Sequence, residues 1–328
     1  MKVLILHDDV AGSERPDDLD VFAQLRAVEE ALTASGRAAL ASPFGLDLGR
    51  ARAAIERERP DLVFNLVESV GGAGRLIHLA PALLDSLGVP YTGCPTEAIL
   101  LCSNKLLAKR LLAQSGLPTP GWIAPREHDA PLEPGRYLVK SVWEDASIGL
   151  DDGALVELRP GADVAGLLRE RAPRFGGAAF AEAYIEGREI QVSLLGEPDG
   201  GARILPPSEI VFRDWTPGKP RIVGYAAKWC PESFEYRHTT ARLEFASEDT
   251  KLLRELGELA LRCWELFGLA GYARVDFRVD AGGRPWILEL NPNPALTDDS
   301  GLAASAAAAG LRPADVIERI VACALAPR

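Results

Sequence analysis

One segment, residues 272–291, restricts the possible folds of this chain more than any other feature of its sequence. Apolar and charged residues alternate over 272–280, which is the pattern of a β-strand with one buried face. The sequence Ala-Gly-Gly-Arg at 281–284 then predicts a tight turn, because two glycines supply the positive φ angles of a two-residue hairpin loop. A second, largely apolar strand follows at 286–291. The segment is therefore expected to form a β-hairpin.

Four polar side chains of this hairpin are expected to share one face. If the two glycines form the loop, Asp276 lies opposite Glu289 and Arg274 lies opposite Asn291. Two carboxylates placed across strands repel each other, but a divalent cation such as Mg²⁺ reverses that repulsion and also accepts a carboxamide oxygen. The alternative is a solvated face whose charges Arg274 and Arg278 compensate. The apolar second strand and the prolines after Asn291 favour a buried metal site.

The composition is that of an ordinary globular protein, long enough for two or three domains. The chain has 328 residues, of which 47% are hydrophobic and 25% charged. Its net charge of −11 argues against non-specific nucleic-acid binding, although a nucleotide needs only a few local cations. No apolar run reaches the ~18 residues that span a bilayer, so no membrane partner is expected. The five cysteines show no metal-binding spacing and predict reduced thiols in a cytoplasmic protein.

Strand-like and helix-like segments alternate over residues 1–95, which predicts a parallel α/β domain. The expected elements are strands at 2–6, 61–66 and 89–93 and helices at 21–35 and 76–87. A different pattern begins at residue 96. Here Ser103 is expected to cap a helix that carries Lys105 and stops at Gly116.

Two further regions complete the predicted organisation. Residues 96–184 are expected to form a central subdomain, and residues 185–328 a C-terminal one. The expected elements of the central subdomain are strands at 137–140 and 178–185 and a short helix at 164–171. In the C-terminal subdomain a long helix is expected to begin at Ser247, because Glu248 and Asp249 suit the positive first turn.

The hairpin sequence RVDFRVDAGGRPWILELNPNPALT resembles the metal-binding hairpin of the ATP-grasp superfamily, specifically its D-alanine–D-alanine ligase branch. Other motifs occur in the same order over most of the chain. The resemblance implies an α/β (α+β) ATP-grasp fold, in which a Rossmann-like domain precedes two subdomains that sandwich the nucleotide. It also implies that Arg274 touches the reacting phosphate. Asp276, Glu289 and Asn291 would hold two Mg²⁺ ions, for which Mn²⁺ can substitute.

Two lysines are candidates for contacts with the phosphates of ATP. Lys140 ends the strand in YLVKSVWEDASIGL and precedes a loop of small residues, whose backbone N–H groups can cover phosphates. Lys105 lies in the first turn of its helix, where a cation opposes the helix dipole and indicates a nearby anion. Taken alone, either lysine is more often a solvated surface residue. The resemblance assigns both to the nucleotide, and Ser147 and Ile148 to the loop over its β- and γ-phosphates.

The remaining nucleotide contacts rest on the resemblance. The segment AFAEAYIEGREIQVSLL predicts two strands, on which Glu182 and Glu189 would accept from the adenine amino group and the ribose hydroxyls. Tyr184 and Ile185 would supply backbone contacts to the base, and a salt-bridged strand surface is the alternative. Lys228, in VGYAAKWCPESFEY, would lie on a mobile closing loop and reach the γ-phosphate, with a surface lysine as the alternative.

The chemistry that the resemblance implies needs no protein nucleophile. A substrate carboxylate attacks the γ-phosphate while cations neutralise the transferred group, and an amine then captures the acyl phosphate. Arg274, Lys228 and Ser147 are the predicted catalytic residues. The expected activity is ATP-dependent carboxylate–amine ligation of small amino-acid-like molecules, with a homodimer expected by analogy. An intramolecular cyclase or a phosphotransferase is one alternative, and a non-catalytic nucleotide-binding module is another.

The expected substrate pocket departs from the D-alanine–D-alanine pattern. Family ligases join a loop serine, a closing-loop tyrosine and an N-terminal glutamate around the first D-alanine. Here Ala146 and Trp229 stand at the serine and tyrosine positions and cannot rebuild that side-chain hydrogen bond. The N-terminal glutamate position is open between Asp9 and Glu14. The other predicted pocket residues are Glu68, Ala295, Asp299 and Ser300.

These departures predict a product other than D-alanyl-D-alanine. Glu68 stands at a histidine position of the family, and Asp299 lies beside the serine expected to dock the second substrate. Their added negative charge predicts a substrate with an extra amino or guanidino group. The alternative is that either carboxylate pairs with a protein arginine such as Arg75.

Overall fold

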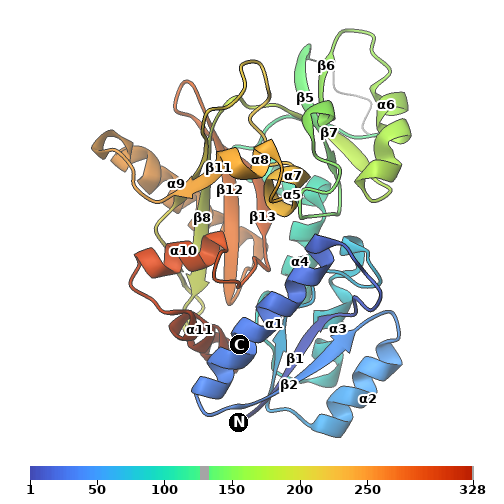
Figure 1. The fold of residues 1–328 in the computed structure, drawn as a ribbon, viewed down its shortest axis with the longest axis vertical. Coiled ribbons are helices and arrows are strands. Elements are labelled where there is room, and N and C mark those ends of the chain that lie inside the picture. The colour runs from blue at the N-terminus through green and yellow to red at the C-terminus, as the bar shows by residue number, and fades with distance from the viewer. Residues whose placement is uncertain (126–132, 327–328) are drawn as a thin grey trace.

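Three sheets form the described part of the chain. The computed structural model describes residues 1–125 and 133–326. Figure 1 shows the first sheet in the lower half of the molecule and the other two in the upper half. One sheet is parallel and two are antiparallel, with helices packed against them. The α/β (α+β) class expected from the sequence is confirmed.

The first sheet is parallel, with strand order β2-β1-β3. Its strands are β1 (Lys2–Asp8), β2 (Ala38–Phe44) and β3 (Leu62–Asn65), and its helices are α1 (Pro16–Ala34), α2 (Leu48–Glu58) and α3 (Leu79–Leu87). β1 and β3 are apolar and buried because helices cover both faces of a parallel sheet. α1 begins at Pro16 rather than at the predicted residue 21. Proline suits the first helical position, and Asp17 and Asp18 suit the positive end of the helix.

Residues 89–93 do not form the predicted strand. Only an isolated bridge joins Tyr91 to Val63. Pro90 has no N–H to donate to a ladder, and Gly93 turns the chain with a φ of +87°. The apolar sequence therefore packs along β3 without extending the sheet.

The second sheet has four antiparallel strands in the order β4-β7-β5-β6. They are β4 (Trp122–Ile123), β5 (Gly135–Ser141), β6 (Leu155–Leu158) and β7 (Ala179–Ala183), with α4 (Thr96–Ser103) and α5 (Lys105–Gln114) before them and α6 (Val164–Arg171) packed on β7. The predicted cap Ser103 is instead the last residue of α4. The side chain of Asn104 caps α5, because its carbonyl oxygen accepts from two backbone N–H groups of the first turn.

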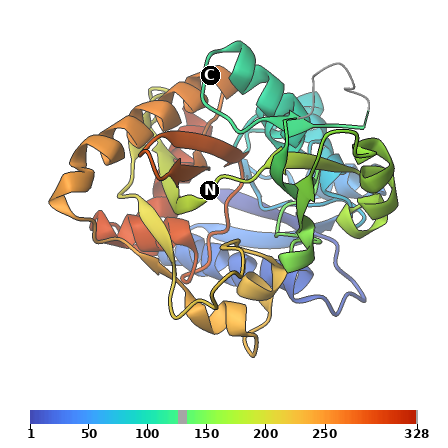
Figure 2. The same cartoon turned by 90° about the horizontal axis from the view of Figure 1, so that it is seen from above.

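The third sheet has six antiparallel strands, ordered β11-β10-β8-β12-β13, with β9 paired to β8. They are β8 (Gly187–Gly196), β9 (Ala202–Ile204), β10 (Ser208–Phe212), β11 (Thr239–Arg242), β12 (Tyr272–Asp280) and β13 (Pro285–Asn291). The helices of this region are α7 (Tyr225–Trp229), α8 (Phe234–His238), α9 (Thr250–Phe267), α10 (Gly301–Ala308) and α11 (Pro313–Leu325). α9 shares a hydrophobic core with this sheet (Figure 2). A 3₁₀ turn occupies Ser247–Asp249, so the α-helix itself begins at Thr250 rather than at the predicted Ser247.

The hairpin of β12 and β13 has the predicted pairing of its polar residues, for a different reason. The loop has three residues, 281–283, because the N–H of Asp280 donates to the carbonyl of Arg284. This loop alone would place Glu289 on the opposite face, and a β-bulge at Leu288 restores the register. As a result both Leu288 and Glu289 line the same cleft.

The domain boundaries predicted after residues 95 and 184 stay predictions. No helix in the described ranges is long and apolar enough to cross a membrane. All five cysteines lie among the described residues, and none of them forms a disulfide there.

Candidate active site

A cleft between the second and third sheets collects the residues predicted to bind a nucleotide. Strands β5 and β7 line one side, and β12 and β13 line the other. The predicted nucleotide residues all line this cleft, namely Lys105, Lys140, Ser147, Ile148, Glu182, Tyr184, Ile185, Glu189 and Lys228. Asp276 and Glu289 of the hairpin line it too. The fold therefore brings together side chains from distant parts of the chain.

Glu182 is buried between two lysines. Its Oε2 accepts from Lys140 Nζ at 3.1 Å, and its Oε1 lies 2.5 Å from Lys109 Nζ. Burial alone would raise the pKa of Glu182, but the two cations together lower it. Lys109 was missed by the sequence analysis, although it lies one helical turn after Lys105 on α5. The predicted contact of Glu182 with an adenine amino group stays a prediction and would compete with these ion pairs.

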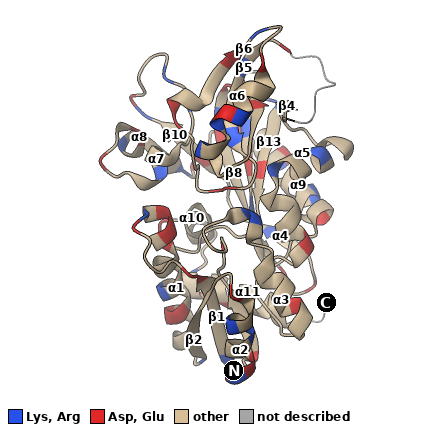
Figure 3. Cartoon of the chain, turned by 90° about the vertical axis from the view of Figure 1, so that its right-hand side faces the viewer, with Lys and Arg blue, Asp and Glu red and all other residues tan. Residues whose placement is uncertain are grey.

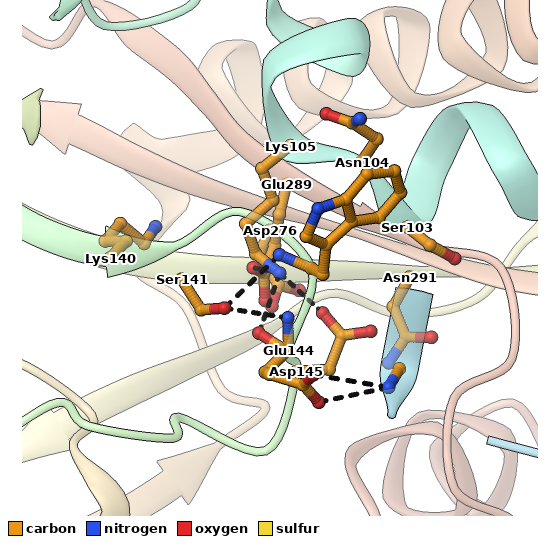
Figure 4. A network of polar contacts seen from close by, with 12 residues as sticks. Ser103, Asn104, Lys105, Lys140, Ser141, Glu144, Asp145, Asp276, Glu289 and Asn291 are labelled. Atoms are coloured by element: carbon orange, nitrogen blue, oxygen red, sulfur yellow. Dashed lines mark hydrogen bonds and ion pairs between the residues drawn. The ribbon is translucent and has the colours of Figure 1, made fainter. Parts of the chain in front are cut away.

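Lys105 is buried among carboxylates (Figure 4). Its ammonium donates to Asp145 Oδ1 at 2.7 Å and to the carbonyl of Glu144 at 3.1 Å, and it lies 3.8 Å from Glu289 Oε2. Burial lowers the pKa of Lys105, but the neighbouring carboxylates raise it by more. Lys105 is thus a fixed cation, and a phosphate oxygen could take the place of Asp145 beside it. Asp145 was not among the predicted residues.

Arg274 and Asp276 form a bidentate ion pair on one face of β12. Arg274 Nε lies 2.6 Å from Asp276 Oδ1, and Nη2 lies 2.8 Å from Oδ2. Arg274 therefore points at the hairpin carboxylates and is not among the residues that line the cleft. Asp276 is only 6% exposed. A metal ion held by Asp276 would share its oxygens with Arg274 or displace one of these contacts.

The hairpin offers oxygen donors of the kind that Mg²⁺ accepts. Asp276 and Glu289 line the cleft, whereas Asn291 lines an adjoining cavity and accepts from the N–H of Asn293 at 2.9 Å. Burial alone would raise the pKa of Glu289, but surrounding cations, Lys105 foremost, lower it and keep the carboxylate ionised. Within the described residues no three Asp, Glu, His or Cys side chains converge as a metal site. The residues present fit an ion whose shell is completed by phosphate oxygens and water.

Arg278 lies against the predicted ribose contact. Its Nη2 is 2.8 Å from Glu189 Oε2, and its guanidinium is 5.8 Å from the centre of the Tyr184 ring. Burial raises the pKa of Glu189, and the charge of Arg278 opposes that rise. A carboxylate has two oxygens, so Glu189 can still accept from a hydroxyl in the cleft.

A second cavity adjoins the cleft, and six of the 18 residues that line it are acidic. Glu144, Asp145 and Ile148 line both spaces. The acidic residues around this second cavity, called the acidic cavity below, are Asp8, Asp17, Asp18, Glu68, Glu144 and Asp145. Arg15 is the one basic residue among the described residues that line it. Figure 3 shows acidic positions along α1, which contributes two of these carboxylates. The acidic cavity therefore favours a cationic ligand.

The structure divides the predicted substrate residues into two groups. Glu68 and Ala146 line the acidic cavity. The others lie outside its lining, namely Asp9, Glu14, Trp229, Ala295, Asp299 and Ser300. Ser300 instead caps α10, because its hydroxyl accepts from the N–H of Ala303 at 3.1 Å. Asp8 was missed, although it ends the first strand of a parallel sheet, which is where such sheets bind ligands.

Hydrogen bonds hold two carboxylates of the acidic cavity in place. Asp8 accepts from the N–H of Glu68 at 2.8 Å and from the hydroxyl of Ser69 at 2.7 Å, yet burial raises its pKa to about 6. Glu68 accepts from Gln24 Nε2 at 2.8 Å. Enclosure by protein and the nearby acids raise the pKa of Glu68 as well, although its side chain keeps access to water from the cavity. These raised pKa values indicate that the two acids lack a compensating cation.

Comparisons with known proteins agree with this geometry. A protein family described as D-ala D-ala ligase C-terminus matches residues 111–322. The D-alanine–D-alanine ligase of Methylococcus capsulatus is 34% identical over 294 residues, which cover 87% of this chain and 85% of that protein. The D-alanine–D-alanine ligase of Moorella thermoacetica is 32% identical over 89% of this chain and 94% of its own length. The chain belongs to the D-alanine–D-alanine ligase family.

Membership of this family makes the chain an ATP-grasp enzyme, an ATP-dependent ligase that forms a carbon–nitrogen bond. The fold agrees with that assignment. The D-alanine–D-alanine ligase of Bacillus anthracis complexed with ATP matches with a TM-score of 0.70, over 99% of this chain and 97% of that one. Its sequence is 20% identical, so this likeness concerns the fold alone.

Where D-alanine–D-alanine ligases carry a serine and a tyrosine, this chain has a different hydrogen bond. The indole Nε1 of Trp229 donates to the backbone carbonyl of Ala146 at 3.0 Å. Ala146 and Ser147 have φ angles of +51° and +61°, and the N–H of Ile148 donates to the carbonyl of Asp145 across this tight turn. The indole of Trp229 and the backbone of Ala146 thus join these two positions.

Proposed function

We propose that the protein uses ATP to join the carboxylate of an amino-acid-like substrate to an amine through an acyl phosphate. One observation carries this proposal. A cleft lined by Lys105, Lys140 and Lys228 adjoins an acidic cavity, and the loop 144–148 borders both spaces. An anionic triphosphate and a cationic substrate would therefore meet at this loop.

The hairpin carboxylates Asp276 and Glu289, together with Asn291, are proposed to hold two Mg²⁺ ions, which Mn²⁺ can replace. Such an ion supplies neutralisation of the negative charge on the ATP phosphates. The support is that two carboxylates face each other across the hairpin, an arrangement that costs repulsion unless cations lie nearby. Arg274 provides part of that compensation and would keep Asp276 oriented.

Three residues are proposed to act during the reaction. Lys228 lines the cleft from α7, and burial, followed by the charge of Arg274, lowers its pKa. The ammonium group of Lys228 would gain an anionic partner when a phosphate group of ATP binds. Arg274, beside both hairpin carboxylates, would stabilise the oxyanion that forms when the amine attacks. Ser147 would act through its backbone, because its hydroxyl already donates to the carbonyl of Val223 at 2.8 Å.

The substrate is proposed to be an amino acid or amine that carries an additional positive charge. D-alanine has no side-chain charge to offer the carboxylates of the acidic cavity. A guanidinium or ammonium group could pair with Asp8 and Glu68, whose raised pKa values mark an electrostatic need for a cation. Arg15 already pairs with Asp17 and Asp18, and Lys105 pairs with Asp145, so Asp8, Glu68 and Glu144 are the acids left for the ligand.

The experiment that tests this function is ADP release measured across a panel of amino acids and amines, with products identified by mass spectrometry. A product equal to acid plus amine minus water, formed with one ADP, supports the proposal. A product that equals a single substrate minus one water would make the protein a cyclase. A stable phosphorylated product would make it a phosphotransferase. ADP release that stays at background with every substrate, while ATP binds, would contradict the proposal. The homodimer and the cytoplasmic location stay predictions.

A further inference from the structure

Two segments over the cleft are bonded into one unit. The covering loop, residues 145–150, meets the closing segment, residues 223–229, through three hydrogen bonds. They run from Ser147 Oγ to the carbonyl of Val223 at 2.8 Å, from the N–H of Tyr225 to the carbonyl of Leu150 at 3.0 Å, and from Trp229 Nε1 to the carbonyl of Ala146 at 3.0 Å. Gly224 permits this approach, because a Cβ there would lie 2.7 Å from the carbonyl oxygen of Leu150. The two segments therefore move together or not at all.

The short helix α7 of the closing segment turns three side chains toward the site. Tyr225, Lys228 and Trp229 are spaced by three and four residues, which places them on one side of a helix. Lys228 lines the nucleotide cleft, and Trp229 bonds to the covering loop. Tyr225 reaches in a third direction, to the N-terminal domain.

Tyr225 bonds to a carboxylate of the acidic cavity. Its hydroxyl donates to Asp17 Oδ1 at 2.7 Å, across 208 residues of sequence. The side chain of Asp17 is 6% exposed and is also held by Arg15, so its position is well defined. Burial, together with the charge of Asp17, raises the pKa of Tyr225 to about 12, so the hydroxyl stays a donor throughout the neutral range.

We propose that Tyr225 and Asp17 form a latch that holds the closing segment and the covering loop over the reacting groups and keeps water out. The inference rests on the proposed function. If water reaches the acyl phosphate, it attacks the carbonyl carbon, the bond from carbon to the phosphate oxygen breaks, and free carboxylate and phosphate result. ATP is then consumed without ligation. Tyr225 is thus a positioning residue, in a place where the serine–tyrosine bond of related ligases is missing.

Tyr225→Phe removes the hydroxyl and keeps the ring, and Tyr236→Phe on α8 is the matched control, because Tyr236 is 42% exposed. The ratio of ADP released to ligated product is expected to rise about threefold to tenfold in Tyr225→Phe, the effect of losing one partly exposed hydrogen bond to a charged acceptor. The KM for ATP should change less than this ratio. An unchanged ratio with a proportional loss of both products would make Tyr225 merely structural and overturn the latch.

Hydrogen exchange tests the latch without any substrate. The backbone amides of 223–229 should exchange faster by a similar factor in Tyr225→Phe, which lacks the donor, and in Asp17→Ala, which lacks the acceptor, and no faster in Tyr236→Phe. The double variant should add little to either single one, because both break the same bond. Exchange equal to wild type in both variants would refute the latch, whatever reaction the protein performs. A wild type that makes no ligated product would refute the proposed function while leaving this exchange result intact.

Discussion

The nucleotide cleft and the acidic cavity share a wall but differ in charge and in how far they could be anticipated. The cleft is lined by three lysines and by hairpin carboxylates that those lysines compensate. The acidic cavity has carboxylates on β1, α1 and the loop after β3, with Arg15 as the basic residue of its described lining. Every residue predicted for the nucleotide lies in the cleft, whereas most residues predicted for the substrate lie outside the acidic cavity.

The difference indicates that the two spaces are suited to ligands of different charge. ATP is the same molecule in every member of the family, so the cleft keeps recognisable motifs. The acidic cavity is proposed to take the other substrate, and no motif in the sequence analysis marked residues of its lining such as Asp8 and Asp17. Five experiments can break or sharpen this contrast, from the largest expected effect to the smallest.

The largest effect is expected at the hairpin. Glu289→Gln should lower turnover by about a hundredfold or more, because it removes a charged ligand and leaves Lys105 and Arg274 with less compensation. Glu258→Gln, on the exposed face of α9, is the control and should behave as wild type. Initial rates of ADP release measure the effect, and thermal melting checks the fold. Wild-type turnover in a folded Glu289→Gln protein would show that Glu289 of the hairpin takes no part in the reaction.

The second effect concerns the third phosphate. Lys228→Ala should lower kcat about tenfold or more while ADP binds almost as tightly as to wild type, because ADP lacks the γ-phosphate that Lys228 would contact. Lys251→Ala, at an exposed position, is the control. Stopped-flow rates and calorimetric ADP affinities give the two numbers. Equal losses in kcat and in ADP affinity would assign Lys228 to another part of the cleft.

The third effect is a pH dependence in the acidic cavity. Burial raises the pKa of Asp8 from 3.8 to about 6, so the charged form appears only as pH rises through about 6. The affinity for arginine or lysine should therefore rise by up to about tenfold from pH 5 to pH 7, and the affinity for alanine should stay flat. Calorimetric titration at the two pH values measures it. If the affinity for arginine and lysine did not change with pH, the charged group of these ligands would not lie beside Asp8.

The raised pKa of Asp8 also makes the stability of the folded protein depend on pH, in a defined direction. The folded state binds the proton of Asp8 more tightly than the unfolded state does. Protonation of Asp8 therefore makes its full contribution to the free energy of unfolding below about pH 4, and this contribution is lost as pH rises to about 6. The melting temperature of wild type should thus fall relative to that of Asp8→Asn over this interval. Asp214→Asn, at an exposed position, should track wild type throughout.

The smallest effect is expected from restoring the family side chains. Ala146→Ser with Trp229→Tyr should raise turnover with D-alanine by a few-fold only, because the carboxylates of the acidic cavity remain. The double variant also loses the indole bond to the carbonyl of residue 146, so some activity with the natural substrate should be lost. Efficient D-alanyl-D-alanine synthesis by the wild type at sub-millimolar D-alanine would contradict the proposal that the acidic cavity selects a cationic substrate.

The hairpin shows how much local sequence can predict. Its alternation and its glycines predicted a hairpin, because strand period and turn chemistry depend on adjacent residues, and the hairpin is present with Asp276 opposite Glu289. The predicted two-residue loop was nevertheless wrong, and the bulge at Leu288 corrects the register. A bulge is decided by packing of β13 against its neighbours, which no local pattern reports.

The sequence by itself determined the fold class and the family, and it predicted the three lysines that line the nucleotide cleft and four of its carboxylates, Glu182, Glu189, Asp276 and Glu289. Only the tertiary structure decided that Lys109 shares Glu182 with Lys140, and that Tyr225 reaches Asp17. Such contacts join residues that lie far apart in the chain, and their geometry depends on how three sheets and their connecting loops pack together. The acidic cavity is of the same kind, because its carboxylates come from separate elements, and the pKa of Asp8 is raised only when folding buries that side chain.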